Sequence, residues 1–295
     1  MIYDIRHRTT YAYGSEVTYA RCVMRLTPRT FADQTRLASR IELTPSPSQE
    51  RVGPGAFGEE VRTVVITEPH ARLVIEASAR VDVHAPPIAF AFDTPWESVR
   101  ALSLASRLLG PDGPASFLYP TERTPIAPQI TDYARASFAP GRPVIEAASE
   151  LTSRIHADFR YDPDATDVRT PAAAAFAARH GVCQDFAHVM ISGLKGLGLP
   201  AAYVSGYLHT GRGGNRLQGA DATHAWVHLW CGEAAGWVGF DPTNDMTTRD
   251  DHIVLAIGRD YADVAPIDGV LLAPGAQTLE VEVEVTSEND FPSPT

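Results

Sequence analysis

The sequence predicts an α+β protein, with a β-rich N-terminal part, a helical middle and a second β-rich part. Three observations lead to this fold class. Apolar residues alternate with a period of two through roughly the first ninety residues. They recur at three- and four-residue spacing in the middle third, and they alternate again beyond residue 200. We therefore expect an N-terminal antiparallel β domain followed by a separate mixed core.

The N-terminal strands each place apolar side chains on one face. Gly and Pro cluster at 45–58 and separate the strands, so a β-sandwich-like or barrel-like domain is expected over residues 1–92. Cys22 lies on one of the apolar faces, which favours a buried structural thiol. The four predicted faces are Tyr3, Ile5, His7, Thr9, Tyr11 and Tyr13; Ala20, Cys22, Met24 and Leu26; Leu37, Ile41 and Leu43; and Leu73, Ile75, Ala77, Ala79, Val81 and Val83.

Two helices are predicted at the start of the second domain. Thr94 is expected as N-cap, with Pro95 at the first helical position and Glu97 three residues after the cap, and this helix is expected to reach about Leu109. A later helix has an apolar stripe, which indicates one buried face. The residues of that stripe are Val144, Ala148, Leu151 and Ile155.

Beyond residue 200 the pattern returns to strands. The second domain is expected to cover 93–286, and the polar residues 287–295 are expected to form a disordered tail. The predicted strands are AAYVSGYL (201–208), ATHAWVHLW (222–230), GWVGFDPT (236–243) and TLEVEVEV (278–285).

Composition argues against several classes of protein. The net charge of −11 is unfavourable for nucleic acid or an anionic membrane as main partner. The first residues include Asp4, Arg6 and Arg8, so they contain no apolar segment of a secretory signal, and no uncharged apolar run approaches the roughly 18 residues of a membrane span. Three scattered cysteines predict reduced thiols rather than a disulfide framework. A cytoplasmic location is expected.

Cys183 stands where two predicted helices meet. A short Ala-rich helix begins after Thr170 and is expected to close at Gly181 in a left-handed conformation. A second, buried helix begins near Cys183, so the thiol falls in its first turn, where unpaired N–H groups and the helix dipole favour a thiolate. The same N–H groups could bind the oxyanion of an acyl intermediate. Cys183 is therefore either a nucleophile or a small residue packed at a helix start.

A thiolate nucleophile needs a base and an acceptor that orients the base. The strand 222–230 carries His224, and the six-residue segment CGEAAG leads into the strand that carries Asp241. In a hairpin with a loop of even length, these two residues lie on the same face, opposite or diagonal to each other. The sequence therefore predicts that Asp241 orients the imidazole of His224.

Two metal-binding alternatives compete with this interpretation. His224, His228 and Cys231 read as H-x3-H-x2-C, which would suit zinc on a helix. On a strand, however, Cys231 points to the opposite face, and His228 lies roughly 13 Å from His224. The acidic stretch DPTNDMTTRDD matches no calcium-binding loop and is expected to be solvated. The remaining histidines His7, His180, His188 and His252 are expected to be structural or solvated.

Three motifs together resemble a known family. HGVCQDFAH, THAWVHLW and GWVGFDPTN, in this order, are similar to the transglutaminase-like (transglutaminase core) superfamily, whose members carry a Cys, His, Asp triad. The opening YDIRHRTTYAYG, the DFRYDP segment and HIVLAIGRDYADVAPIDGV look like its bacterial cysteine-protease branch, in which a β-rich domain precedes the core. The resemblance covers nearly the whole chain.

The resemblance implies a papain-like core, with the cysteine helix packed on an antiparallel sheet that bears His and Asp. It implies Cys183 as nucleophile, His224 as general base and acid, and Asp241 as the orienting acceptor. Some relatives use calcium, but no cofactor is expected here. Papain-like enzymes place a Gln six residues before the nucleophile, but that position is Ala177 here, so the second oxyanion donor is unassigned.

Four further residues are candidates for the substrate groove. Trp226 shares the His224 face, Tyr161 belongs to the DFRYDP segment, and Gln184 and Asp185 follow the nucleophile. Asp185 is expected first of all to cap the helix.

The function that these residues predict is cysteine-dependent acyl transfer on a protein, peptide or amide substrate through a thioester. Water as acceptor would make the protein a protease or amidase, and an amine would make it a transglutaminase; hydrolysis is favoured. The competing hypothesis is a catalytically silent binding module that has kept the fold.

Overall fold

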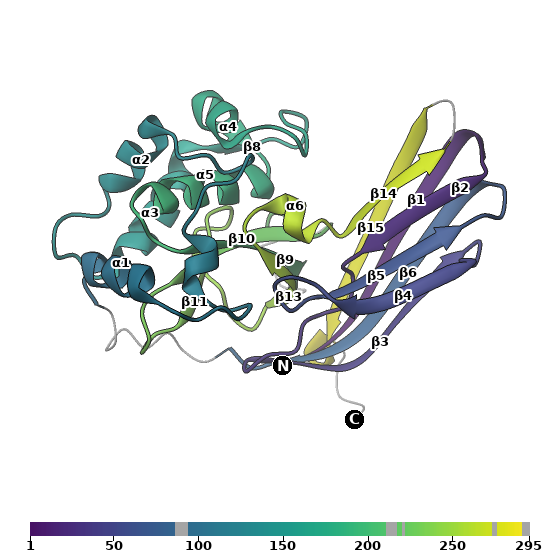
Figure 1. Cartoon of the computed structure of the whole chain (residues 1–295), viewed down its shortest axis with the longest axis horizontal. Coiled ribbons are helices and arrows are strands. Elements are labelled where there is room, and N and C mark those ends of the chain that lie inside the picture. The colour runs from purple at the N-terminus through teal and green to yellow at the C-terminus, as the bar shows by residue number, and fades with distance from the viewer. Residues whose placement is uncertain (86–93, 211–216, 220–221, 273–275, 291–295) are drawn as a thin grey trace.

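The computed structural model describes residues 1–85, 94–210, 217–219, 222–272 and 276–290. They form a β-sandwich and a mixed core that lie side by side (Figure 1). No helix within these described ranges is both long enough and apolar enough to cross a membrane.

The β-sandwich consists of two four-stranded antiparallel sheets. One sheet has the strand order β15-β1-β6-β3 and the other β14-β2-β5-β4. Between them lies an apolar cluster in which the predicted alternation is satisfied, and Cys22 is buried there as expected. The strands are β1 (Ile2–Val17), β2 (Tyr19–Met24), β3 (Gln34–Thr44), β4 (Gln49–Pro54), β5 (Glu60–Ile66), β6 (His70–Val83), β14 (Ile267–Leu272) and β15 (Gln277–Ser287).

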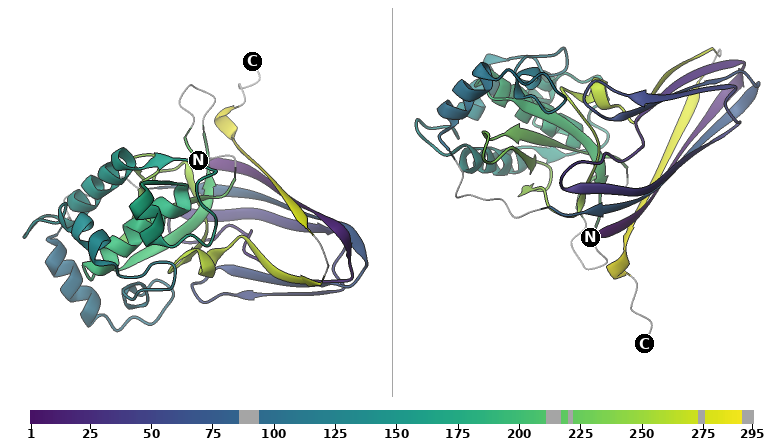
Figure 2. Two further views of the ribbon diagram at one scale, coloured as in Figure 1. Left: turned by 90° about the horizontal axis from the view of Figure 1, so that it is seen from above. Right: turned by 60° about the horizontal axis from the view of Figure 1, so that its bottom comes forward.

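The domain division differs from the prediction at the C-terminal end. β14 and β15 belong to the sandwich, because β14 pairs with β2 and β15 with β1, from Tyr3 opposite Ser287 to Tyr13 opposite Gln277. In Figures 1 and 2 the yellow C-terminal strands accordingly lie among the purple and blue N-terminal ones. Assigning all of 93–286 to the core was therefore wrong, and the β domain is discontinuous in sequence. The predicted boundary at 92/93 lies outside the described residues.

The predicted tail is in part structured. β15 ends at Ser287, whose N–H donates to Asp290 Oδ2 at 2.6 Å, and His209 Nε2 contacts the same carboxylate oxygen at 2.9 Å. Residues Glu288–Asp290, directly after β15, form a 3₁₀ turn (η3). Residues 291–295 lie outside the described ranges.

Three further details of the secondary structure differ from the prediction. β4 lies within 45–58, which was expected to be only a separator. Leu37 is exposed because the pairing of β3 with β6 shifts register between Arg36 and Ala38. The first helix of the core, α1 (Trp96–Ala105), is preceded by Pro95 as N-cap without a side-chain cap, and it ends before Leu109.

The core contains a five-stranded antiparallel sheet with the order β12-β11-β10-β9-β13. Helix α5 packs on one face of this sheet. Phe31, from the connection between β2 and β3, packs on the other face. The other core elements are η2 (Pro114–Phe117), α2 (Pro128–Arg135), α3 (Val144–Asp158), β7 (Arg160–Tyr161), α4 (Ala172–Ala178), β8 (His180–Gly181), α5 (Cys183–Gly196), β9 (Ala201–Leu208), β10 (His224–Trp230), β11 (Trp237–Asp241), β12 (Met246–Thr247), β13 (His252–Gly258) and α6 (Tyr261–Val264).

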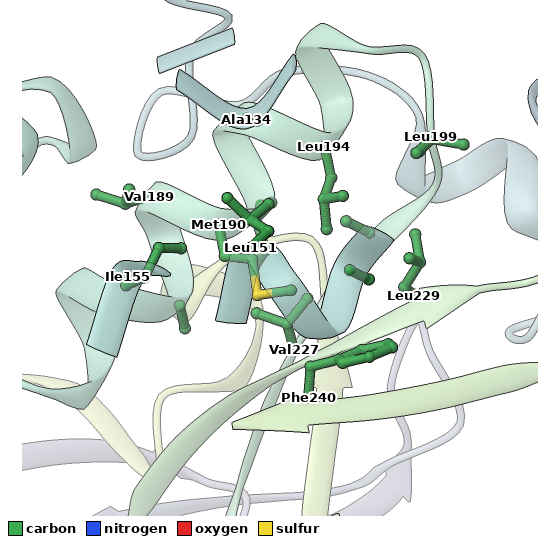
Figure 3. Close-up of a cluster of buried hydrophobic side chains, with 14 of the residues drawn as sticks. Ala134, Leu151, Ile155, Val189, Met190, Leu194, Leu199, Val227, Leu229 and Phe240 are labelled. Atoms are coloured by element: carbon green, nitrogen blue, oxygen red, sulfur yellow. The ribbon is translucent and has the colours of Figure 1, made fainter. Parts of the chain in front are cut away.

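Helix α5 is the centre of the core. Figure 3 shows Met190 and Leu194 of this helix facing Val227 and Phe240 of the sheet. On its other side, a Cβ at Gly193 would lie 2.8 Å from the Cβ of an α2 alanine, so glycine is what lets the two helices approach. The predicted stripe of α3 is fully buried against this cluster. Because α5 is packed on all sides, the position of its first residue is rigidly defined.

The sandwich and the core share an apolar interface. Tyr3 and Ile5 of β1 pack with Ile253 of β13. The Gln34 side-chain amide donates to the backbone oxygen of Val254 at 2.8 Å and accepts from its N–H at 2.7 Å, which joins the sandwich to the edge of the core sheet. The sandwich thus contacts the core at β13, the strand whose first residue is His252.

Candidate active site

The thiol of Cys183 lies at the N-terminus of α5, as predicted. Val182 is the N-cap, and its N–H donates to Asp185 Oδ2 at 2.8 Å; Thr166 Oγ1 donates to the same oxygen at 2.6 Å. Burial raises the pKa of the Asp185 carboxyl. The expectation that Asp185 caps the cysteine helix is therefore confirmed.

The left-handed residue that closes the preceding helix is Arg179, with φ of 57°, and not Gly181 as predicted. Gly181 is required for another reason. A Cβ on this residue would lie 2.4 Å from Asp185 Oδ2, so only glycine leaves room for the capping carboxylate. The backbone just before Cys183 therefore passes close to the Asp185 carboxylate that caps α5.

His224 and Asp241 lie diagonally across the β10–β11 hairpin. The register pairs Trp230 with Trp237 and Val227 with Phe240, which leaves a six-residue loop as the sequence predicts. His224 Nε2 is 2.8 Å from Asp241 Oδ2, and both side chains are fully buried. The predicted His–Asp interaction is confirmed.

The Asp241 carboxylate is surrounded by hydrogen-bond donors. Oδ1 accepts from the backbone N–H of Thr243 at 2.9 Å and of Asn244 at 3.2 Å. Oδ2 accepts from Asn244 Nδ2 at 2.8 Å and contacts His252 Nε2 at 3.3 Å, in addition to His224. This carboxylate is therefore fixed in position and cannot rotate without losing several hydrogen bonds.

His252 and Asn244 are site residues that the sequence reasoning missed. His252 was expected to be structural or solvated, but it is buried between Asp241 and Asp251, whose Oδ1 is 2.6 Å from His252 Nδ1. Its position depends on the pairing of β13 with β9, which local periodicity does not specify. The sequence did contain a signal for Asn244. An Asp side chain commonly accepts hydrogen bonds from the backbone a few residues later, so Asn244, three residues after Asp241, could be expected beside its carboxylate.

The electrostatics of the site favour a charged His–Asp pair. Burial alone would raise the pKa of Asp241, but the charges and hydrogen bonds of His224 and His252 hold it well below its usual range. Burial would lower the pKa of His224, but the charge and hydrogen bond of Asp241, together with the side chain of Cys183, raise it to about 10. His224 is therefore an imidazolium at neutral pH, with the Cys183 thiol within reach of its ring.

The orientation of the imidazole is set by its Nε2 contact. Because Nε2 faces Asp241, Nδ1 is left as the ring nitrogen for a thiolate partner. Nδ1 is buried and makes no hydrogen bond of standard geometry with the described residues. The free ring nitrogen and the thiol thus form a pair in which a proton can be exchanged.

The raised pKa of His224 predicts a pH dependence of stability. The imidazole titrates near 6.5 in an unfolded chain and at about 10 in the fold, so its contribution to stability is complete below about 6.5 and is lost as the pH rises through about 10. We expect the difference in free energy of unfolding between wild type and His224→Gln, measured by urea denaturation, to shrink between pH 6.5 and 10. Asp241 stays ionised throughout this range. A difference that is constant with pH would contradict the charged pair.

A cavity of about 450 Å³ opens at Cys183. Tyr161 reaches it because β7 pairs in parallel with β8, which places Tyr161 opposite Gly181. The described lining residues are Tyr161, Pro163, Cys183, Leu217, Gln218, Gly219, Ala222 and Thr223.

Three of the four candidate groove residues do not line this cavity. Asp185 is one of them, because its carboxylate caps α5. Gln184 Nε2 donates to the backbone oxygen of Val168 at 3.2 Å and is buried. Trp226 is 0% exposed, with ring centroids 6.1 Å from His224 and 5.1 Å from His252, and it lines a separate cavity between the sandwich and the core. Trp226 shares the His224 face as expected, but it lies one residue pair further into the sheet, in an apolar cluster with Val204 and Val254 against which Phe31 packs.

Neither of the two predicted metal-binding alternatives corresponds to a cluster of ligands among the described residues. No three His, Cys, Asp or Glu side chains in these ranges converge as a metal site. Cys231 Sγ donates instead to the backbone oxygen of Leu229. In the acidic stretch, Asp245 accepts from Ser153 Oγ and Asp250 from the N–H of Ala85, so this loop is bonded to the protein rather than simply solvated as expected.

Three other histidines have structural surroundings. His7 Nδ1 lies 2.9 Å from the Tyr207 hydroxyl, and His188 Nε2 accepts from the N–H of Tyr261. Burial lowers the pKa of His7 to about 4 and the pKa of His188 and His228 to about 3. These imidazoles are neutral and do not contribute charge to the Cys183 site.

Comparisons with known proteins agree with this geometry. Residues 3–82 match the bacterial transglutaminase-like N-terminal region, and residues 131–242 match the transglutaminase-like superfamily. An uncharacterized protein of Mycobacterium tuberculosis (strain ATCC 25618 / H37Rv) is 36% identical over 293 residues, which cover 96% of this chain and 92% of that protein. The chain belongs to the transglutaminase-like superfamily. The second match contains Cys183 and His224 and ends one residue after Asp241.

This transglutaminase-like protein has further relatives. An uncharacterized protein of Mycobacterium leprae is 32% identical over 286 residues, or 95% of this chain and 96% of that protein. A protein-glutamine gamma-glutamyltransferase of Pseudomonas aeruginosa is 33% identical over 135 residues, or 42% of this chain and 19% of that protein. The crystal structure described as a "Putative Cysteine Protease" from Cytophaga hutchinsonii has the same fold, with a TM-score of 0.79, 23% identity and coverage of 100% of this chain and 93% of that one.

Proposed function

We propose that this protein is a cysteine-dependent acyltransferase that acts on peptide or carboxamide carbonyls through a thioester on Cys183. The Cys183 thiolate adds to the carbonyl carbon, and the C–N bond breaks as His224 gives its proton to the leaving amine. Water or a second amine then attacks the thioester, and His224 accepts the proton of this nucleophile. The acid or new amide leaves, and the thiolate is restored.

The observation that carries the proposal is the charged His224–Asp241 pair within reach of Cys183. Asp241 holds Nε2 and stabilises the imidazolium, so Nδ1 is the nitrogen that would accept and return the proton. A buried ion pair in this arrangement has no comparable use in a module that only binds, because it requires desolvation of both charges.

The start of α5 supplies a site for the negative oxygen of the intermediate. The first N–H groups of a helix have no partner within the helix, and they point along the positive end of its dipole. In α5 these groups belong to Cys183 and Gln184, directly beside the thiol. Backbone N–H groups would therefore bind the oxyanion, a role in which a Gln takes part in papain-like enzymes and which Ala177 cannot perform.

Hydrolysis is the preferred outcome of the proposed cycle, and product analysis tests it. Purified protein would be incubated with a panel of blocked glutamine- and amide-containing peptides, with and without putrescine as amine. We expect ammonia or peptide fragments to be released and acyl–Cys183 to be trapped by acid quench and mass spectrometry, with no product in Cys183→Ala. Putrescine incorporation without hydrolysis would reassign the protein as a transglutaminase. The absence of any acyl–Cys183 adduct across the panel would support the binding module instead.

A further inference from the structure

We infer that Asn244 determines the width of the acyl-binding cavity by fastening the segment 217–219 to the catalytic carboxylate. This inference deepens the proposed function and rests on it for the identity of the cavity. We call residues 217–219 the cavity wall, since all three line the space at Cys183.

The Asn244 side chain holds the wall at two points. Its Oδ1 accepts from the N–H of Gln218 at 2.9 Å, and its Nδ2 donates to the backbone oxygen of Gln218 at 3.3 Å. The second hydrogen of Nδ2 goes to Asp241 Oδ2 at 2.8 Å. A primary amide offers two N–H donors, so one side chain connects both polar groups of Gln218 to the catalytic Asp241.

The wall passes directly over the ring nitrogen that serves Cys183. Gly219 has a left-handed φ of 86°, and a Cβ built on it would lie 2.5 Å from His224 Nδ1. A small outward movement of the wall would therefore open the space above the His224–Cys183 pair. Cys183 is only 9% exposed and His224 only 1%, so the wall position decides what can reach the thiol.

Tyr161, another residue that lines the cavity, has no comparable freedom. It is fixed by the pairing of β7 with β8 and by ring contact with Phe186 of the buried helix α5. An acyl group that enters must fit in the space that both Tyr161 and the wall line. Asn244 is thus a specificity-determining residue that selects slender acyl groups, and it acts through the wall rather than on the reacting atoms.

Loss of the Asn244 side chain removes one hydrogen bond from Asp241 and a 3.5 Å contact with His224 Nε2, but it leaves the other partners of Asp241. Asp241 would still accept from the N–H of Thr243 and contact both His224 and His252. A change in the reactivity of the thiolate would alter its reaction with reagents of every size, so a ratio of labelling rates isolates the effect on access. This separation makes the inference testable without a known substrate.

The experiment measures alkylation of Cys183 by a small reagent, iodoacetamide, and by a bulky one, N-(1-pyrenyl)maleimide, with peptide mapping. In Asn244→Ala we expect the ratio of bulky to small labelling rates to rise by about tenfold or more, whatever the change in the iodoacetamide rate itself. On any peptide that is turned over, the same variant should raise KM more than it lowers kcat. An unchanged ratio of labelling rates would overturn the inference.

Two more variants separate access from folding. Gln218→Pro removes the N–H that Asn244 binds, at an exposed position outside the core, and it should reproduce the effect of Asn244→Ala. Asp245→Asn is the matched control: it is the next residue, its carboxylate accepts from Ser153 away from the cavity, and Asn tolerates its left-handed φ of 52°. The control should keep the wild-type ratio; a rise equal to that of Asn244→Ala would assign the effect to general loosening and refute the inference.

The alkylation ratio tests the role of Asn244, and peptide turnover tests the proposed acyl transfer, so the two proposals can be refuted separately. If wild type turns over no peptide but the ratio rises in Asn244→Ala, the wall assignment holds and the proposed acyl transfer is refuted. If peptides are turned over and the ratio is the same in wild type and both wall variants, only the role of Asn244 is refuted.

Discussion

His224→Ala is expected to lower peptide turnover by several orders of magnitude and to abolish rapid alkylation of Cys183 near pH 6. A free cysteine titrates near 8.5 and is almost entirely protonated at pH 6, so fast labelling there requires a nearby cation. The His224 imidazolium, whose pKa the Asp241 charge raises to about 10 against the effect of burial, is that cation. Without it, the thiolate and the proton donor for the leaving amine are lost together.

The measurement is the iodoacetamide rate at Cys183 between pH 5 and 9, by peptide mapping in wild type and variant. His228→Ala is the matched control, because His228 lies on the same strand, is neutral, and has no side-chain hydrogen bond within the described residues. This control should keep the wild-type profile. If folded His224→Ala reacts as fast as wild type at pH 6, the triad is only a likeness and the protein is better studied as a binding module.

Asp241→Asn is expected to lower turnover by about 10²- to 10⁴-fold, by analogy with other triads that lose the orienting carboxylate. Both carboxylate oxygens accept hydrogen bonds, Oδ1 from two backbone N–H groups and Oδ2 from His224 and Asn244. An amide must turn its NH₂ group toward one of these donor sets. It also removes the charge that keeps His224 protonated, so the fold should lose about 3–5 kcal/mol of stability as well.

Turnover and thermal unfolding of Asp241→Asn would be compared with those of Asp251→Asn. Within the described residues, the Asp251 carboxylate makes a hydrogen bond only to His252 Nδ1, the nitrogen that faces away from Asp241. Its variant therefore removes a neighbouring charge and leaves the His224–Asp241 contact in place. We expect Asp251→Asn to keep most of the turnover. Equal losses in the two variants would mean that the net charge of the cluster, and not the orientation of His224, is what matters.

The sequence predicts the parts of this site that depend on local structure. The spacing of apolar residues after Cys183 predicts a helix that begins near this residue, and α5 begins there. His224 and Asp241 were brought together by strand alternation and an even loop, and the hairpin register agrees. In both cases the relevant partners lie within one element or one short hairpin, where helix and strand geometry alone fixes which side chains meet.

The tertiary structure decided what lies around these residues. His252 reaches Asp241 because β13 pairs with β9. Trp226 is buried in a cluster against which Phe31, from the distant β2–β3 connection, packs. β15 returned to β1, more than 260 positions earlier in the chain, although its alternation was equally compatible with the core sheet. A period of two specifies that a strand has one buried face, but not which strand it pairs with. That choice depends on long-range packing, in which every edge and apolar face must find a partner at once.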